Sequence, residues 1–312
     1  MSEVTIASYN VHGGVDGWGR PFDVVGPCAQ VDADVLVLQE AWSPDVGRPL
    51  AHRVADELGY GLCELALARG RILAPPPDPG PRWGPRLWER RAHGMRLNHN
   101  RAGAPVRGRW RATAGRPAER GSWGIAVLSR LPVLRTRTVD LGQLRNDPAR
   151  RGAIVAELDA GARVTVVGTH FAHLSHGSPL HVGRLRRALE ASAVPGPGQP
   201  VSSGLGRAGS VPPEIPRADD PAGAPIVLVG DMNLWGPPLR ALFPGWEQAV
   251  RGRTWPSWSA WPLAQSDHIF VRGALRVTNG EVLRIGGSDH YPVKATLSLD
   301  ERQGAGLPSV RA

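Results

Sequence analysis

The amino-acid sequence predicts an α/β fold. Short apolar runs bounded by turn residues recur along the chain, and such runs are typical of central strands that are covered on both faces. The clearest example is IVLVG at 226–230, which is followed directly by Asp231 and Asn233. Open α/β sheets bind their ligands in the crevice beyond the ends of the strands. The sequence therefore predicts a layered fold with a functional site at its strand ends.

Strands and helices are expected in a mixed order. Apolar residues recur at helical spacing over 45–58, beginning with Val46, and again over 180–191. Gly59 suits the end of the first helix, because glycine tolerates the left-handed conformation found there. Strands are expected near 4–9, 35–39, 61–67, 125–129, 153–158, 163–168, 226–230, 268–271 and 293–299.

Two segments interrupt this pattern. Residues 75–122 are rich in proline, glycine and arginine, and residues 194–225 are low in complexity. Neither composition buries much apolar surface, so both are predicted as surface insertions. Motifs needed for one site lie on either side of them. We therefore expect a single domain over 1–300, followed by a tail at 301–312.

Composition limits the compartment and the kind of site. Of the 312 residues 41% are hydrophobic, enough for a substantial core, and no apolar run approaches the roughly 20 residues of a membrane span. The N-terminal residues lack a basic start and an apolar signal core, so we expect a cytoplasmic protein. The two cysteines, Cys28 and Cys63, match neither a disulfide framework nor a zinc site.

Positive charge is concentrated in one part of the chain. The net charge is +9, and residues 75–120 hold eleven arginines against three acids, or +8. Three tryptophans lie among these arginines. A basic segment interleaved with tryptophan can hold phosphates and stack bases, so nucleic acid is the expected partner, with Arg109, Trp110 and Arg111 as candidate contacts. The alternative is a solvated insertion of no consequence.

Polar residues that suit catalysis stand where the expected strands begin or end. They are Asn10, Glu40, His170, Asp231 and Asn233 after strands, and Asp267, Asp289 and His290 at strand starts. Taken singly, each has an ordinary explanation as a turn or capping residue. Their recurrence at several strand ends favours one shared site.

Acidic residues packed into one crevice would repel one another without a cation. Oxygen ligands without cysteine indicate Mg²⁺, with Mn²⁺ as the alternative, rather than zinc. Such a metal is commonly held by one or two carboxylates together with a substrate phosphate, which leads to phosphoryl chemistry. His170 and His290 could carry protons or stabilise developing charge, and Asp267 could orient one of them.

Six motifs occur in a fixed order along the chain. They are YNVHGG (9–14), LQE (38–40), GTH (168–170), GDMN (230–233), SDHIFV (266–271) and SDHYPV (288–293). Together they resemble the endonuclease/exonuclease/phosphatase superfamily, also called the DNase I-like family, from residue 4 to about residue 299. The resemblance implies a four-layer sandwich of two mixed β-sheets flanked by helices. It also implies metal-dependent cleavage of a phosphate ester by water.

The resemblance assigns metal ligands and narrows the substrate. It implies that Glu40 is the principal metal ligand, with Asn10 nearby and Asp289 as a further carboxylate on the metal side. GDMNLW and AQSDHIF differ from the corresponding motifs of inositol polyphosphate phosphatases, which argues against that branch. Ile125 stands where many nucleases of the family have asparagine, so one polar group near the phosphate is missing.

The resemblance also implies the catalytic roles. Asp231 and Asn233 match the pair that activates or positions the nucleophile, and His170 matches the histidine that stabilises the phosphate. His290 matches an essential histidine. Asp267 matches the acid that orients a histidine, and the choice between His170 and His290 stays open at this point.

Three functions are compatible with the sequence. The first is a Mg²⁺-dependent hydrolase of phosphodiester bonds in nucleic acid, with the basic segment as the grip. The second is a phosphatase or phosphodiesterase that acts on a small phosphorylated metabolite or a lipid headgroup. The third is a catalytically silent binding protein of the same fold, and the intact acids and histidines argue against it.

Overall fold

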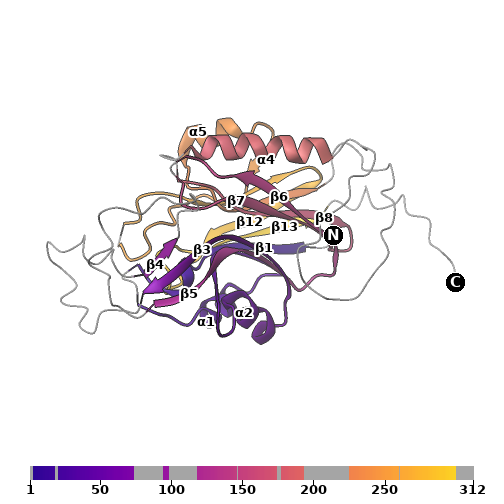
Figure 1. The fold of residues 1–312 in the computed structure, drawn as a ribbon. Coiled ribbons are helices and arrows are strands. Elements are labelled where there is room, and N and C mark those ends of the chain that lie inside the picture. The colour runs from indigo at the N-terminus through magenta and orange to yellow at the C-terminus, as the bar shows by residue number, and fades with distance from the viewer. Residues whose placement is uncertain are drawn as a thin grey trace.

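Two β-sheets packed face to face form the centre of the molecule, and helices cover their outer faces (Figure 1). The computed structural model describes residues 3–17, 20–73, 94–97, 118–145, 147–173, 177–192, 225–259 and 261–299. This is the four-layer sandwich of mixed sheets that the sequence motifs imply. The described residues contain no helix with the length and apolar character needed to cross a membrane.

The first sheet has seven strands and contains both ends of the described chain. Its order is β12 (Leu275–Val282), β13 (Val293–Leu299), β1 (Glu3–Asn10), β2 (Val35–Pro44), β5 (Ala118–Ser129), β3 (Gly61–Leu73) and β4 (Gly94–Leu97). Strands β1 and β2 are parallel, and the other neighbours are antiparallel. Because β1 and β2 run in the same direction, their last residues reach the same edge of the sheet.

The second sheet has six strands and repeats this arrangement. Its order is β10 (Glu247–Gln248), β11 (Asp267–Arg272), β9 (Ile226–Asp231), β8 (Arg163–His170), β7 (Arg151–Asp159) and β6 (Val133–Gly142). Strands β8 and β9 are parallel, in a register that places His170 opposite Asp231. The antiparallel strand β11 begins with Asp267, which pairs with Asp231.

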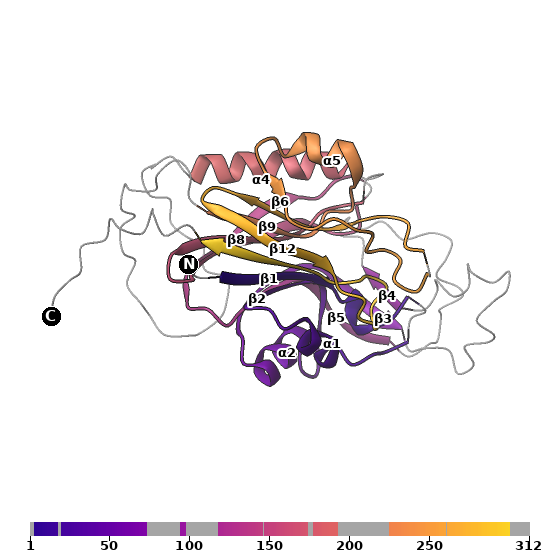
Figure 2. The ribbon, with the colours of Figure 1, turned by 180° about the vertical axis from the view of Figure 1, so that it is seen from behind.

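The strands bury both faces. On β2, Val35 and Val37 face the core between the sheets, whereas Leu36 and Leu38 face the helices, as the two-residue period of a strand requires. Helices α1 (Val25–Val31) and α2 (Leu50–Leu58) cover the first sheet, and α4 (Ser178–Ser192) and α5 (Gly236–Leu242) cover the second. Figure 2 shows the two helical layers on opposite sides of the sheets.

All nine expected strands lie within observed strands, and the helix expected at 180–191 lies within α4. The helix expected over 45–58 begins only at Leu50, after Pro49 in an extended conformation, and Val46 is 88% exposed. Strands β6 and β12 were not predicted, because both are edge strands with mostly polar, exposed residues. Helices α1 and α5 have only seven residues each, too few for a clear period.

The expected insertion at 75–122 is in part sheet. Strand β4 and the first residues of β5 lie within it and pair with the extended strand β3. Its other residues, including Arg109, Trp110 and Arg111, lie outside the described part of the chain. The same holds for the expected tail at 301–312 and, apart from Pro225, for the segment 194–225.

Gly230 brings β8 and β9 unusually close just before the candidate catalytic residues. Its φ is 153°, and a Cβ built on it would lie 1.9 Å from the backbone oxygen of Thr169. Any side chain would therefore push the two strands apart. The glycine of the GDMN motif thus sets the spacing between His170 and Asp231, which end these strands.

His268 makes the stability of the fold depend on pH. Its buried Nε2 lies 2.9 Å from the oxygen of Gln265 and 3.1 Å from that of Leu234, so Nε2 carries the proton. Its Nδ1 accepts from the amide of Gln248 at 3.2 Å. This network fixes the neutral ring, and burial lowers the pKa of His268 from 6.5 to about 4.

Acidification is therefore expected to destabilise the fold through His268. The unfolded chain binds the proton near pH 6.5 and the folded chain only near pH 4, so stability falls as pH drops through this window. Between pH 7 and pH 5 the loss from this group is about 2 kcal/mol. Urea unfolding of the wild type and of His268→Gln at both pH values measures it. An equal pH dependence in the two proteins would contradict this account.

Candidate active site

The strand ends of both sheets meet in one cluster, which Asn10 joins together. The amide nitrogen of Asn10, at the end of β1, donates to Oδ2 of Asp231 at 3.0 Å and to Oε1 of Glu40 at 3.3 Å. These two acids lie on β9 and β2, so a single side chain connects the two sheets at the site. The carbonyl oxygen of the same amide accepts the backbone N–H of His12 at 3.0 Å.

Asp231 is a buried carboxylate held at both oxygens. Its Oδ2 accepts from Asn10, and its Oδ1 accepts the backbone N–H of Asn233 at 2.9 Å. Burial raises its pKa to about 7, and the negative charge of Asp267 adds to the effect. A carboxylate in this environment can take up a proton near neutral pH.

His290 and Asp267 form a hydrogen-bonded pair beside it. Nδ1 of His290 lies 2.8 Å from Oδ2 of Asp267, and both side chains are buried. Burial alone would lower the pKa of His290, but the carboxylates of Asp267 and Asp289 outweigh it and raise the pKa well above 6.5. The neighbouring carboxylates therefore favour the protonated ring. Its Nε2 lies 3.9 Å from Oδ2 of Asp231 and 3.9 Å from Oδ1 of Asp289.

His170 contacts Asn233 and stays neutral. The amide nitrogen of Asn233 donates to the oxygen of Phe171 at 3.1 Å and lies 3.0 Å from Nε2 of His170, which must then be an acceptor. Burial lowers the pKa of His170 well below 6.5, and the charges of Arg151 and His290 lower it further. The acid that could orient either histidine is thus paired with His290, whereas His170 supports Asn233 and lies 3.6 Å from Asp231.

Asp289 lies near Nε2 of His290, whereas Asp267 binds the other ring nitrogen, Nδ1. Its Oδ2 accepts from Nε1 of Trp255 at 3.2 Å, and its Oδ1 lies 3.5 Å from Nδ1 of His12. Burial would raise the pKa of Asp289, but the charges of His12 and His290 lower it, so the group stays ionised. Asp289 and His290 were expected at the start of a strand, but they lie in the loop before β13. Glu40 was expected after a strand, but β2 continues through it to Pro44, with an irregularity in its pairing to β5 between Gln39 and Ala41.

Three residues of the site adopt backbone conformations that L-residues rarely take. The φ angles are 45° at His12, 56° at Glu40 and 49° at Asn233. Positive φ in a residue other than glycine costs energy and persists only where the surrounding structure enforces it. Here each of the three residues carries a side chain of the cluster, so the strained backbone aims functional groups into the site.

The sequence reasoning missed three residues of the site. They are His12, which contacts Asp289, Trp255, which donates to Asp289, and Ser288, whose hydroxyl donates to the backbone oxygen of Asn10 at 2.6 Å. His12 and Ser288 belong to motifs that carry the resemblance, so their positions offered a signal. Trp255 stands in an irregular segment, and only the fold brings it to the site.

Two sets of residues could hold a cation. Ligand atoms of Asp231, Asp267 and His290 lie within 4.8 Å of one another, and Nδ1 of His290 and Oδ2 of Asp267 are already joined by a hydrogen bond. The other set consists of oxygen donors from Glu40, Asp289 and Asn10. Nδ1 of His12 lies 3.5 Å from Asp289. Burial would lower the pKa of His12, but the charges of Asp289 and Glu40 raise it. Carboxylate and amide oxygens of this kind fit Mg²⁺.

Comparisons with known proteins agree with this fold. The model of the Endonuclease/Exonuclease/phosphatase family matches residues 7–290. No curated protein gave a significant match to the sequence. Among solved structures, an endonuclease/exonuclease/phosphatase from Beutenbergia cavernae is 19% identical with a TM-score of 0.55, and the alignment covers 96% of this chain and 72% of that one.

Two eukaryotic structures are similar in the same way. D. rerio TDP2 complexed with a single-strand DNA product is 14% identical with a TM-score of 0.53, over 96% of this chain and 100% of that one. The human Nocturnin catalytic domain with a bound sulfate anion is 13% identical with a TM-score of 0.56, and the alignment covers 96% of this chain and 94% of that one. At these identities the likeness is one of fold.

Proposed function

Because this chain belongs to the endonuclease/exonuclease/phosphatase family, we propose that it is a divalent-metal-dependent hydrolase of phosphodiester bonds in nucleic acid. The observation that carries the proposal is the pairing of a buried carboxylate, Asp231, with a cationic histidine, His290. A base and a cation side by side suit the attack of water on phosphorus. We assign this activity to one domain over residues 1–300.

Asp231 acts as the base in this scheme. Water loses a proton to the carboxylate as its oxygen bonds to phosphorus, and the bond from phosphorus to the leaving oxygen breaks. Asn10 and the backbone N–H of Asn233 fix the two oxygens of the carboxylate, so its direction is set before substrate binds. His170 supports this arrangement through Asn233. Its role in stabilising the phosphate, which the resemblance implies, stays a prediction.

His290 stabilises negative charge in this scheme. The Asp267 carboxylate holds Nδ1, so Nε2 is directed away from that pair and lies between Asp231 and Asp289. A proton on Nε2 can be donated to a phosphoryl oxygen, where negative charge grows in the transition state. Asp267 is a positioning residue, because it acts through His290.

Glu40, Asn10 and Asp289 would hold Mg²⁺, or alternatively Mn²⁺. When bound there, the ion would supply positive charge that stabilises the negative charge developing on the phosphate. Glu40 suits the role because its side chain is partly exposed and, among the residues that the structure describes, makes a single long hydrogen bond, to Asn10. His12, 3.5 Å from Asp289, would add a further positive group when protonated.

Nucleic acid is the substrate that the charge distribution favours. The segment 75–120 carries +8 of the net charge together with three tryptophans. Phosphate backbones attract such a segment and bases can stack on its aromatic rings. One structural neighbour was crystallised with single-strand DNA product. A small phosphorylated metabolite or a lipid headgroup is the alternative substrate.

Hydrolysis of a substrate panel tests the proposal. With Mg²⁺ we expect cleavage of bis-p-nitrophenyl phosphate and of DNA or RNA, no cleavage of sphingomyelin, and loss of all activity in EDTA. Combined replacement R109Q, W110A and R111Q should weaken DNA binding and flatten the log–log salt slope by roughly one unit for each phosphate that the protein no longer neutralises. The matched control R276Q, on the exposed face of β12, should change neither. Cleavage confined to sphingomyelin or to phosphorylated metabolites would favour the alternative.

A further inference from the structure

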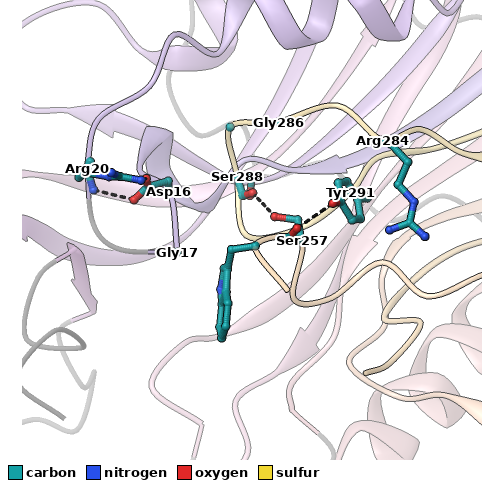
Figure 3. Close-up of a pocket in the computed structure, with 10 residues that line it drawn as sticks. Asp16, Gly17, Arg20, Ser257, Arg284, Gly286, Ser288 and Tyr291 are labelled. Atoms are coloured by element: carbon teal, nitrogen blue, oxygen red, sulfur yellow. Dashed lines mark hydrogen bonds and ion pairs between the residues drawn. The ribbon is translucent and has the colours of Figure 1, made fainter. Parts of the chain in front are cut away.

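A small cavity opens beside the candidate active site and has no part in the chemistry described above. Its volume is about 270 Å³. Figure 3 shows it between the loop that carries Asp16 and Arg20 and the loop that carries Arg284 and Gly286, with Ser257 and Ser288 between them. These loops follow β1 and precede β13, the same two segments that supply Asn10 and His290 to the site.

The cavity is continuous with the candidate site. Ser288, in its wall, donates to the backbone oxygen of Asn10 at 2.6 Å. Gly17, also in the wall, lies so close to Asp289 that a Cβ built on it would be 3.1 Å from the Cβ of that residue. A phosphate bound beside His290 would therefore extend its adjoining group toward this cavity.

Gly17 keeps the cavity open. A Cβ on this residue would lie 2.4 Å from Cδ1 and 2.5 Å from Nε1 of Trp258. Any larger residue would displace the indole ring, which lines the cavity and is 50% exposed. The small residue thus lets an aromatic surface face the space next to the catalytic acids.

The lining combines an aromatic surface with positive charge. The guanidinium of Arg284 lies 4.7 Å from the ring centre of Tyr291, and within the described residues no carboxylate forms an ion pair with it. Arg20, by contrast, is paired with Asp16 at 2.6 Å. Arg284 therefore leaves an uncompensated positive charge at the cavity, which attracts a phosphate and repels a cationic ammonium headgroup.

Hydrogen bonds hold the floor of the cavity in place before any ligand binds. The hydroxyl of Ser257 donates to the oxygen of Ser288 at 2.6 Å, and the hydroxyl of Tyr291 donates to the oxygen of Ser257 at 2.7 Å. The backbone N–H of Ser257 also donates to the oxygen of Asp289 at 2.8 Å. A preformed wall of this kind loses little conformational entropy on binding.

We propose that this cavity binds the nucleoside next to the scissile phosphate, with its base against Trp258 and a second phosphate at Arg284. The inference rests on the proposed function and narrows its substrate to a nucleotide that carries phosphate on both sides of the sugar. The volume lies just below the usual range of ligand pockets, which suits a single nucleoside rather than a longer segment. A choline-type headgroup does not suit the uncompensated positive charge.

Equilibrium binding tests the cavity without turnover. Calorimetry with thymidine 3′,5′-bisphosphate should give tighter binding than with inorganic phosphate or phosphocholine. Trp258→Ala and Arg284→Gln should each raise the Kd for the bisphosphate by about tenfold, the size of one base stack or one phosphate interaction. Gly17→Val should act in the same direction by displacing the indole. Trp261→Ala and Arg276→Gln are matched controls, because both residues are exposed and neither lines the cavity.

Kinetics separate this inference from the proposed function. The quantity to compare is kcat/KM for the p-nitrophenyl ester of thymidine 5′-phosphate, with and without a 3′-phosphate. The wild type should prefer the 3′-phosphorylated ester, and Arg284→Gln should lose that preference. Bisphosphate binding that depends on Arg284, without hydrolysis of any ester, would overturn the proposed function alone. Hydrolysis with unchanged preference and unchanged Kd in the variants would overturn the inference alone.

Discussion

Replacing Asp231 with asparagine is expected to lower kcat by roughly 10²–10⁴-fold, the usual contribution of a general base. Asparagine preserves the shape of the side chain and can still contact Asn10, but it cannot take a proton from water. Substrate binding should change little, because the interaction is made in the transition state. Single-turnover hydrolysis of bis-p-nitrophenyl phosphate measures the effect, and circular dichroism checks the fold.

Two further variants make the result specific. Asp140→Asn alters an exposed acid on β6, which pairs with Arg150. In this variant kcat should stay at the wild-type value. His290→Ala should lower kcat strongly by itself. If the base and the histidine act on one step, the double variant with Asp231→Asn should be far less impaired than the product of the single effects. Multiplicative effects would count against a shared step.

Replacing Glu40 with glutamine is expected to lower activity by at least about 100-fold, the scale seen when one electrostatic interaction with the transition state is removed. The substitution keeps the length of the side chain and removes one charge from the proposed Mg²⁺ site. The fold should survive, because the side chain is partly exposed and its hydrogen bond to Asn10, at 3.3 Å, is long. Activity measured across a Mg²⁺ titration should show a higher requirement for the ion.

A matched control for this variant is Glu64→Gln, which removes a partly exposed acid on β3 that faces His52. It should leave both kcat and the Mg²⁺ requirement unchanged. Near wild-type turnover of Glu40→Gln at saturating Mg²⁺ would show that the ion is held elsewhere. The buried set of Asp231, Asp267 and His290 would then be the next candidate.

The fold was predictable wherever a strand is buried on both faces. The run at 35–39 is continuous in apolar residues because both of its sides are covered, one by the other sheet and one by helices. Strand β12 has no such signal, since only its pairing with β13 at the edge of the sheet defines it. At Val46 the sequence predicted a helix that the structure does not have. The helical spacing of apolar residues extends toward the N-terminus past Pro49, but the helix begins only at Leu50 and Val46 is exposed.

The sequence by itself determined that Asn10, His170 and Asp231 end strands and that Asp267 begins one. A buried strand must finish in a turn, and polar side chains there are visible as interruptions of an apolar run. The sequence could not determine which side chains meet. From the sequence, Asp267 could orient either His170 or His290. In the structure it pairs with His290, which the loop before β13 brings to the start of β11.

The cavity beside the site depends on tertiary structure in the same way. Gly17, Trp258 and Arg284 come from three separate loops, and nothing in their local sequence relates them. Local propensity acts over a few residues, whereas these contacts form only when two sheets pack face to face and bring their loops to one end. The sequence therefore specified the buried strands and the candidate site residues beside them, and the packing of the sheets decided which residues face one another.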